Sequence, residues 1–142
     1  DEYGVDSSMI NLEITETASI NTKSTLMRNM NKLIERGVSF SLDDFGTGHS
    51  NLDYFVDMPV ELVKFDRSFT VSYFENTKAK QVMESVIGMI KKIGLKIVSE
   101  GIETKEQLDT MIGLGVDYIQ GFYFSKPLSQ SDFIEFISSN NQ

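Results

Sequence analysis

Residues 39–48 read SFSLDDFGTG, and they decide the fold because an alternating run ends there in two aspartates and a glycine-rich turn. Alternation with a period of two is typical of a β-strand with one buried face. Adjacent carboxylates are hard oxygen ligands suited to Mg²⁺ or Mn²⁺, and glycines let backbone amides approach an anion closely. Taken alone, the stretch is also consistent with a solvated acidic pair in a strand-end turn. The candidate site residues in this stretch are Asp43, Asp44, Gly46, Thr47 and Gly48.

The rest of the chain alternates between short runs rich in β-branched and aromatic residues and segments with helical periodicity. We expect five strands, at about 10–15, 39–44, 61–66, 96–100 and 118–123. We expect helices at 22–36, 77–93, 104–115 and 129–140, the last with Phe133, Phe136 and Ile137 facing inward. Strands that alternate with helices indicate a parallel sheet with helices packed outside it.

Polar residues stand at or near the carboxyl ends of the other four strands, namely Glu13, Lys64, Glu100 and Gln120. Because side chains alternate between the two faces of a strand, these residues can point to one side of the sheet. In a (β/α)₈ barrel that side is the interior, and the loops at its mouth build active sites. An open doubly wound sheet also gathers ligands at its carboxyl edge, but five strands contributing to one site favour a barrel. We therefore expect an α/β fold that forms part of a TIM-like (β/α)₈ barrel.

Five motifs that run through the chain in order resemble those of the EAL domain family. They are LEITE at 12–16, DDFGTG at 43–48, VKFDRSF at 63–69, SEGIET at 99–104 and QGF at 120–122. The resemblance implies a hydrolase of bacterial second-messenger signalling, which cleaves cyclic di-GMP to linear pGpG with two Mg²⁺ or Mn²⁺ ions. Cyclic di-GMP is then the expected partner.

The resemblance also implies roles for single residues. Glu13 resembles a ligand of the first metal, Asp43 the carboxylate shared between the metals, and Asp44 a ligand of the second metal. Lys64 resembles the lysine beside the attacking water and the scissile phosphate, where a compact ammonium can offset charge on the phosphoryl oxygens. Glu100 resembles a residue that acts as general base or as a ligand of the second metal.

A further set of residues is assigned to substrate contact or to loop support, namely Glu16, Gly46, Thr47, Gly48, Glu103 and Gln120. Glu16 resembles the glutamate that anchors the loop after the aspartate pair, although a carboxylate at a helix N-terminus explains it as well. The residues alone leave other readings open: Lys64 as a snorkelling surface lysine, Glu100 as a solvated strand end, and Gln120 as a hydrogen bonder at the barrel rim.

Composition excludes several classes of site and partner. The chain has no cysteine and one histidine, so it can build neither a zinc–cysteine site nor a site of several histidines. Its formal net charge is −8, which disfavours polymeric nucleic acid and anionic membranes as partners. No apolar run approaches the roughly 18 residues of a membrane span, so we expect no membrane contact by this segment and a cytoplasmic location.

Length sets the last expectation. A TIM barrel needs about 200–250 residues, and 142 residues supply roughly strands 4 to 8 with their helices. The Glu-Ala-Leu motif and an asparagine, which are metal ligands in the family, are absent. We therefore expect residues 1–142 to be the C-terminal part of an EAL domain, inactive alone, and paired as a homodimer or with a complementing N-terminal fragment. The alternatives are a degenerate domain that senses cyclic di-GMP or binds a protein, and an unrelated metal-dependent barrel.

Overall fold

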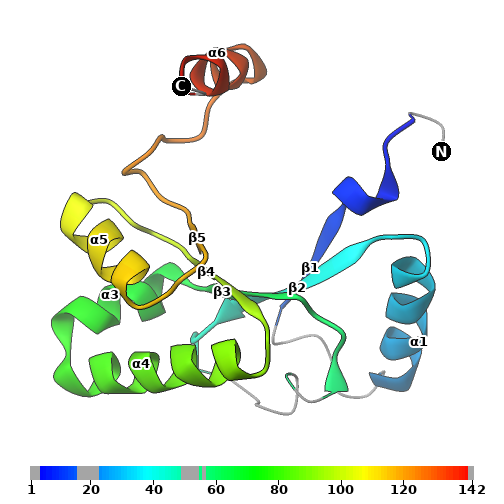
Figure 1. Ribbon diagram of the computed structural model, residues 1–142, viewed down its shortest axis with the longest axis horizontal. Coiled ribbons are helices and arrows are strands. Elements are labelled where there is room, and N and C mark those ends of the chain that lie inside the picture. The colour runs from blue at the N-terminus through cyan, green and yellow to red at the C-terminus, as the bar shows by residue number, and fades with distance from the viewer. Residues whose placement is uncertain (1–3, 16–22, 49–54, 56, 141–142) are drawn as a thin grey trace.

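The computed structural model describes residues 4–15, 23–48, 55 and 57–140, which form one parallel β-sheet with helices packed against it (Figure 1). The strands are β1 (Asn11–Thr15), β2 (Ser39–Phe45), β3 (Leu62–Phe65), β4 (Lys96–Ser99) and β5 (Tyr118–Ile119). Each strand pairs in parallel with the next one along the chain, so the sheet order is β1-β2-β3-β4-β5. The α/β fold and the parallel five-stranded sheet are thereby confirmed.

The helices are α1 (Lys23–Ile34), α3 (Arg67–Glu75), α4 (Thr77–Lys92), α5 (Lys105–Gly113) and α6 (Gln130–Asn140), with a short 3-10 helix η1 at Ser7–Met9. Four of them lie where helical periodicity predicts them, and α5 opens with the expected capping box of Thr104 and Gln107. The exception is α3, which was not expected from the sequence. It begins directly after β3, where the Asp66 carboxylate caps it by accepting a hydrogen bond from the Ser68 backbone N–H.

The hydrophobic core lies between one face of the sheet and the helices α1, α3, α4 and α5. The strands contribute their alternating apolar residues, and the helices contribute side chains that include three methionines, Met30, Met83 and Met111, each at most 1% exposed. The opposite face carries polar residues, because the period of two places them on the side away from the helices. That polar face is the interior side of the predicted barrel.

β5 is shorter than expected, since the predicted strand at 118–123 contains only two paired residues. The chain turns at Gly121, which lies against the backbone of Ile102. A Cβ placed on Gly121 would lie 2.7 Å from the Ile102 carbonyl carbon, and the Tyr123 N–H donates to the Ile102 carbonyl at 3.0 Å. This close approach of two backbones ends the ladder to β4 and directs residues 122–124 away from the sheet.

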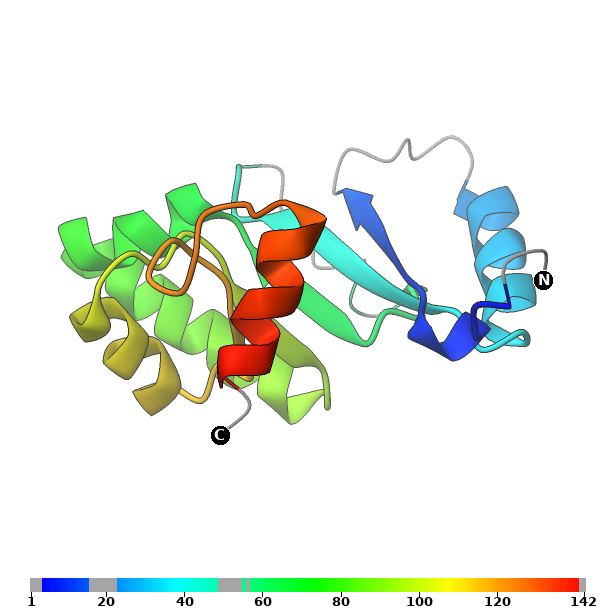
Figure 2. The same ribbon diagram turned by 90° about the horizontal axis from the view of Figure 1, so that it is seen from above.

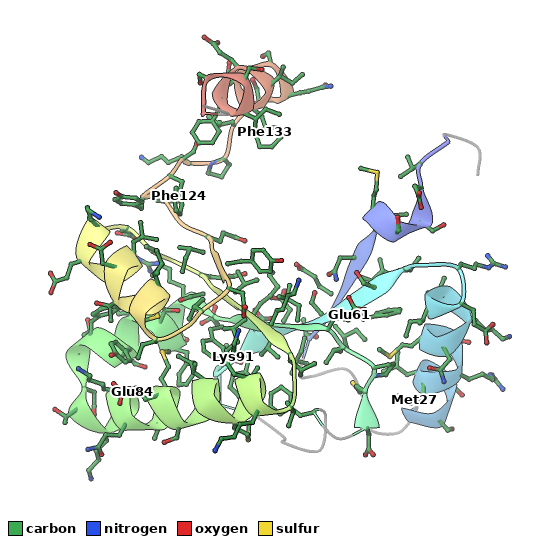
Figure 3. All side chains as sticks on the ribbon, in the orientation of Figure 1. Met27, Glu61, Glu84, Lys91, Phe124 and Phe133 are labelled. Carbon is green, nitrogen blue, oxygen red and sulfur yellow. The ribbon has the colours of Figure 1, made fainter. Side chains whose placement is uncertain are left out.

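α6 stands away from the sheet at the end of the segment that follows β5, as Figure 1 shows and Figure 2 presents from above. The expectation of an inward apolar face is wrong: Phe133 is 53% exposed and Ile137 is 40% exposed. Phe124 and Phe133 both lie on this segment, away from the helices that cover the sheet (Figure 3). Within the part of the chain that the structure describes, no helix is long and apolar enough to cross a membrane.

Candidate active site

Lys64 lies at the centre of a group of charged side chains at the carboxyl ends of β1 to β4. Its ammonium Nζ lies 2.7 Å from Glu13 Oε1, 2.9 Å from Asp43 Oδ1 and 2.9 Å from Glu100 Oε1. We call these four residues the Lys64 cluster. The Lys64 side chain is 12% exposed, so the pairs are only partly screened by water. Three carboxylates around one ammonium leave an excess of negative charge, which favours a further cation at this edge of the sheet.

The neighbouring carboxylates keep Lys64 charged. Burial lowers the pKa of Lys64, but the hydrogen bonds to Glu13, Asp43 and Glu100 raise it, and the net pKa lies above the ordinary value. Lys64 is therefore a donor at neutral pH and cannot accept a proton. A compact ammonium fixed in this way is suited to binding an anionic oxygen.

Strand register brings the cluster together. Glu13 is paired across β1 and β2 with the residue two positions before Asp43. Lys64 is paired across β3 and β4 with the residue two positions before Glu100. Since residues two apart on a strand share a face, all four side chains meet on the polar side of the sheet. The structure thus brings together four of the residues that the sequence analysis selected.

A bulge at the end of β2 places the two adjacent aspartates differently. The register of β2 against β3 shifts between Leu42 and Phe45, and Asp44 has a φ of 59°, in the left-handed region that aspartate tolerates better than most residues. Strict alternation would turn Asp44 toward the apolar core and Phe45 toward the polar face. With the extra residue, Phe45 is 3% exposed in the core, and Asp44 is exposed beyond Asp43.

A chain of polar side chains lies below the cluster on the same face. The Asn11 amide donates to Ser39 Oγ at 2.9 Å, and Ser41 Oγ donates to Asn11 Oδ1 at 2.6 Å. Ser41 is fully buried, so this hydrogen bond satisfies a hydroxyl that would otherwise be costly to bury. Asn11 is not among the site residues predicted from the sequence, although its spacing of two residues from Glu13 indicates the shared face.

The other predicted site residues lie outside the Lys64 cluster. Glu103 pairs with Arg67 at 2.8 Å, and the Thr47 hydroxyl donates to the Asp44 carbonyl at 3.1 Å. Gln120 ties β5 to the preceding loop through its backbone, because its carbonyl accepts from the Ile102 N–H at 3.2 Å. Gly46 and Gly48 both have positive φ values, 99° and 112°, in the turn after β2. Glu16 lies outside the described residues.

The donors of the cluster have the chemistry of a divalent-cation site. Among the described residues, no three acidic or histidine side chains are grouped as a preformed metal site. The oxygens of Glu13, Asp43 and Glu100 instead face the Lys64 ammonium, which lies between them. Carboxylate oxygens are the ligands that Mg²⁺ and Mn²⁺ prefer, so such an ion would share these oxygens with Lys64.

Comparison with known proteins identifies relatives over almost the whole chain. The sequence model of the EAL domain matches residues 1–127. The chain is 37% identical over 128 residues to a protein of Escherichia coli (strain K12) named "Probable cyclic di-GMP phosphodiesterase PdeG", covering 90% of this chain and 25% of PdeG. It is 35% identical to the "Cyclic di-GMP phosphodiesterase PdeL" of the same organism, covering 94% of this chain and 37% of PdeL. The chain therefore spans between a quarter and two fifths of the length of these relatives.

Solved structures agree with the sequence matches. The EAL enzyme Bd1971, in a form with cAMP and cyclic di-GMP bound, superimposes with a TM-score of 0.89 at 32% identity, covering 96% of this chain and 36% of Bd1971. The EAL domain of Mycobacterium smegmatis DcpA gives a TM-score of 0.88 at 33% identity, covering 97% of this chain and 62% of that chain. A manganese and cyclic di-GMP complex of Klebsiella pneumoniae BlrP1 gives 0.80 at 26% identity, covering 89% of this chain and 32% of that chain. These neighbours have the TIM-like barrel fold, of which the described sheet is a part, and the chain belongs to the EAL domain family.

Proposed function

We propose that this chain carries part of the active site of a metal-dependent phosphodiesterase that hydrolyses cyclic di-GMP to pGpG. The observation that carries the proposal is the Lys64 cluster, in which an ammonium and three carboxylates from four strands meet at the carboxyl edge of the sheet. Membership of the EAL family supports the substrate, since relatives are named for this activity and Bd1971 is described with cyclic di-GMP bound.

Glu13, Asp43 and Asp44 are the residues that would hold divalent ions. Their oxygens are hard donors, and the bulge at Asp44 gives two consecutive carboxylates access to the same edge of the sheet. When bound, two such ions supply Lewis-acid polarisation of the phosphodiester. The BlrP1 complex with manganese and cyclic di-GMP supports divalent ions as the cofactor.

The residues of the chain then have separate tasks. Glu100 accepts a proton from the water that attacks phosphorus, and the bond between phosphorus and the ribose 3′ oxygen breaks. The leaving 3′ oxygen takes up a proton from solvent, which gives a free 3′ hydroxyl and a 5′ phosphate. Lys64 offsets the negative charge that develops on the phosphoryl oxygens. It is suited to this task because ion pairs with Glu13, Asp43 and Glu100 hold its ammonium at the carboxyl edge of the sheet.

We further propose that the activity requires the strands that close the barrel, and that residues 1–142 form the C-terminal part of an EAL domain. The open sheet supports this, because in the described residues β1 and β5 each pair on one edge only. An open edge and exposed apolar side chains favour association with another copy or with a complementing N-terminal segment.

The test uses this chain preceded by the N-terminal strands of an EAL domain that carry the Glu-Ala-Leu motif, which we call the completed domain. Chromatographic assay with Mg²⁺ or Mn²⁺ is expected to detect pGpG, and Ca²⁺ is expected to support turnover poorly because it prefers longer bonds and more ligands. Asp109→Asn is the control, since Asp109 pairs with Lys105 on the outer helix α5. Binding of cyclic di-GMP without pGpG under either metal would contradict the proposal and support the sensor alternative.

A further inference from the structure

The first turn of α3 lies between the loop that follows β2 and the loop that follows β4. β3 lies between β2 and β4 in the sheet, and α3 begins two residues after β3 ends. The loop after β2 begins at Gly46, two residues after Asp44, and the loop after β4 begins with Glu100. α3 is therefore placed to contact both loops at once.

Phe69 covers the loop after β2. A Cβ placed on Gly46 would lie 2.5 Å from Phe69 Cγ and 2.6 Å from Phe69 Cβ, closer than real side-chain contacts. The Phe69 ring also packs against Phe45, with ring centroids 6.0 Å apart, and against Phe65 at 5.3 Å. The glycine is required here both by the contact with Phe69 and by its φ of 99°. Phe69 thus rests directly on the backbone two residues beyond Asp44.

Arg67 covers the loop after β4 in the same way. A Cβ placed on Gly101, the residue after Glu100, would lie 2.8 Å from Arg67 Cβ. The guanidinium continues past this glycine to Glu103, where Nη2 lies 2.8 Å from Oε1. The aliphatic part of Arg67 therefore packs on the backbone that follows Glu100, and its charged end pairs with the same loop.

A buried hydrogen bond fixes α3 to β4 between these contacts. Thr70 Oγ1 and Ser99 Oγ lie 3.0 Å apart, and both residues are at most 1% exposed. Ser99 immediately precedes Glu100. A buried pair of hydroxyls that satisfy each other sets the position of the helix along the strand, since a shift would leave both without a partner.

We propose that the first turn of α3 positions the two loops relative to each other, and that Phe69 is the positioning residue for Asp43 and Asp44. This inference rests on the proposed function, because it concerns the spacing of residues that we assign to metal binding. Phe69 contacts Gly46, Phe45 and Phe65 and is not itself a ligand or a proton carrier. It acts through Gly46, whose backbone leaves no space for the loop to move toward α3.

The test compares Phe69→Leu with Tyr73→Leu in the completed domain. Tyr73 lies on the same helix and is 6% exposed, but its hydroxyl donates to Glu84 on α4, away from both loops. Calorimetric titration with Mn²⁺, steady-state kinetics and thermal unfolding are measured on each variant. Phe69→Leu is expected to weaken Mn²⁺ binding and to lower kcat by about 10-fold, the size of effect typical of residues that orient metal ligands. Tyr73→Leu should lower the melting temperature without changing Mn²⁺ affinity.

Two further measurements separate positioning from general loss of stability. Phe69→Met, an unbranched replacement of adaptable shape, should recover most of the Mn²⁺ affinity lost in Phe69→Leu. In the metal-free completed domain, Phe69→Leu should speed amide hydrogen exchange over residues 43–48, whereas Tyr73→Leu should leave that segment at the rate of the parent domain.

The outcomes distinguish this inference from the proposed function. Equal effects of Phe69→Leu and Tyr73→Leu on Mn²⁺ affinity and on exchange over 43–48 would overturn the inference, even if pGpG is formed. If the parent domain forms no pGpG but the two variants differ as expected in Mn²⁺ affinity and exchange, the inference holds and the proposed function fails.

Discussion

The Lys64 cluster and the segment from residue 120 to 140 differ in what surrounds their side chains. In the cluster, strands lie on both sides of Lys64 and helices lie behind it, so a charged side chain is 12% exposed. In the C-terminal segment, Phe122 is 58% exposed, and Phe133 and Ile134 are each 53% exposed. Charged residues usually lie outside and apolar residues inside, and both regions depart from that rule. The sheet and the helices behind it already enclose the polar site, whereas the apolar C-terminal segment needs a further surface to be buried.

The largest expected effect is on turnover, which a substitution in the Lys64 cluster should lower and one in the C-terminal segment should not. In the completed domain, Asp43→Asn should lower turnover by more than about 100-fold, because it removes a charge that both metal binding and the Lys64 ion pair require. The matched substitution in the other region is Asp132→Asn in the first turn of α6. It should leave turnover within a factor of about two, as expected for an exposed surface site. Assay of pGpG at saturating Mn²⁺ provides the measurement, and near-normal turnover of Asp43→Asn would remove Asp43 from the metal site.

The second prediction concerns the exposed surface itself. The purified 142-residue chain should form no pGpG and should associate with itself, because its open sheet edges and the apolar C-terminal segment are available for pairing. Static light scattering gives the mass, and the same sample is assayed with Mn²⁺. A monomeric chain with measurable pGpG production contradicts both parts of this prediction.

The third prediction compares the two regions by stability. Met83→Ala should lower the free energy of unfolding by about 2–5 kcal/mol, since Met83 is fully buried in the core beneath the sheet. Phe133→Ser on α6 should change it by less than about 0.5 kcal/mol and should reduce self-association. Urea unfolding monitored by circular dichroism measures both variants. A loss at Phe133→Ser as large as that at Met83→Ala would mean that α6 is packed in solution.

The smallest expected effect concerns Asp117, whose carboxylate joins the start of β5 to α4 and β4. Burial raises the pKa of Asp117, but hydrogen bonds from Lys91 and the Ile97 N–H lower it, and the net pKa lies below the ordinary value. A depressed folded-state pKa contributes stability above the unfolded-state pKa, about 3.9, and that contribution is lost as the pH falls through the folded-state value. Asp117→Asn should therefore destabilise the chain by about 1 kcal/mol at pH 7.

The pH dependence of this difference is the decisive measurement. Unfolding is followed from pH 7 to pH 2.5 for the parent chain and for Asp117→Asn, and the difference between the two should shrink below about pH 4. Asp109→Asn, which removes an exposed carboxylate paired with Lys105, is the control. A difference that does not change with pH would show that the Asp117 carboxylate is not what fastens the start of β5 to β4.

Local pattern was enough to predict most of the fold and the four residues of the Lys64 cluster. Periodicity located α1, α4 and α5, because their apolar residues recur at helical spacing over many positions. Periodicity did not predict α3, because this helix has only nine residues and buries only two of them, Thr70 and Tyr73. The Asp66 cap with Ser68 two residues later was the available signal.

Other features depend on partners that are distant in the sequence. The bulge at Asp44 is a shift in register between β2 and β3, so the sequence of β2 alone does not fix it. The early end of β5 depends on the approach of Gly121 to Ile102. The link between Arg67 and Glu103 spans 36 residues and is likewise set by packing.

The sequence by itself determined the order of strands and helices and the residue types at each strand end, because alternation and periodicity are properties of consecutive residues. Only the tertiary structure decided that one ammonium joins Glu13, Asp43 and Glu100, since that contact requires the register of four strands at once. It also decided that Phe69 and Arg67 close over two glycines, because such contacts arise only when a helix packs across the strand it follows.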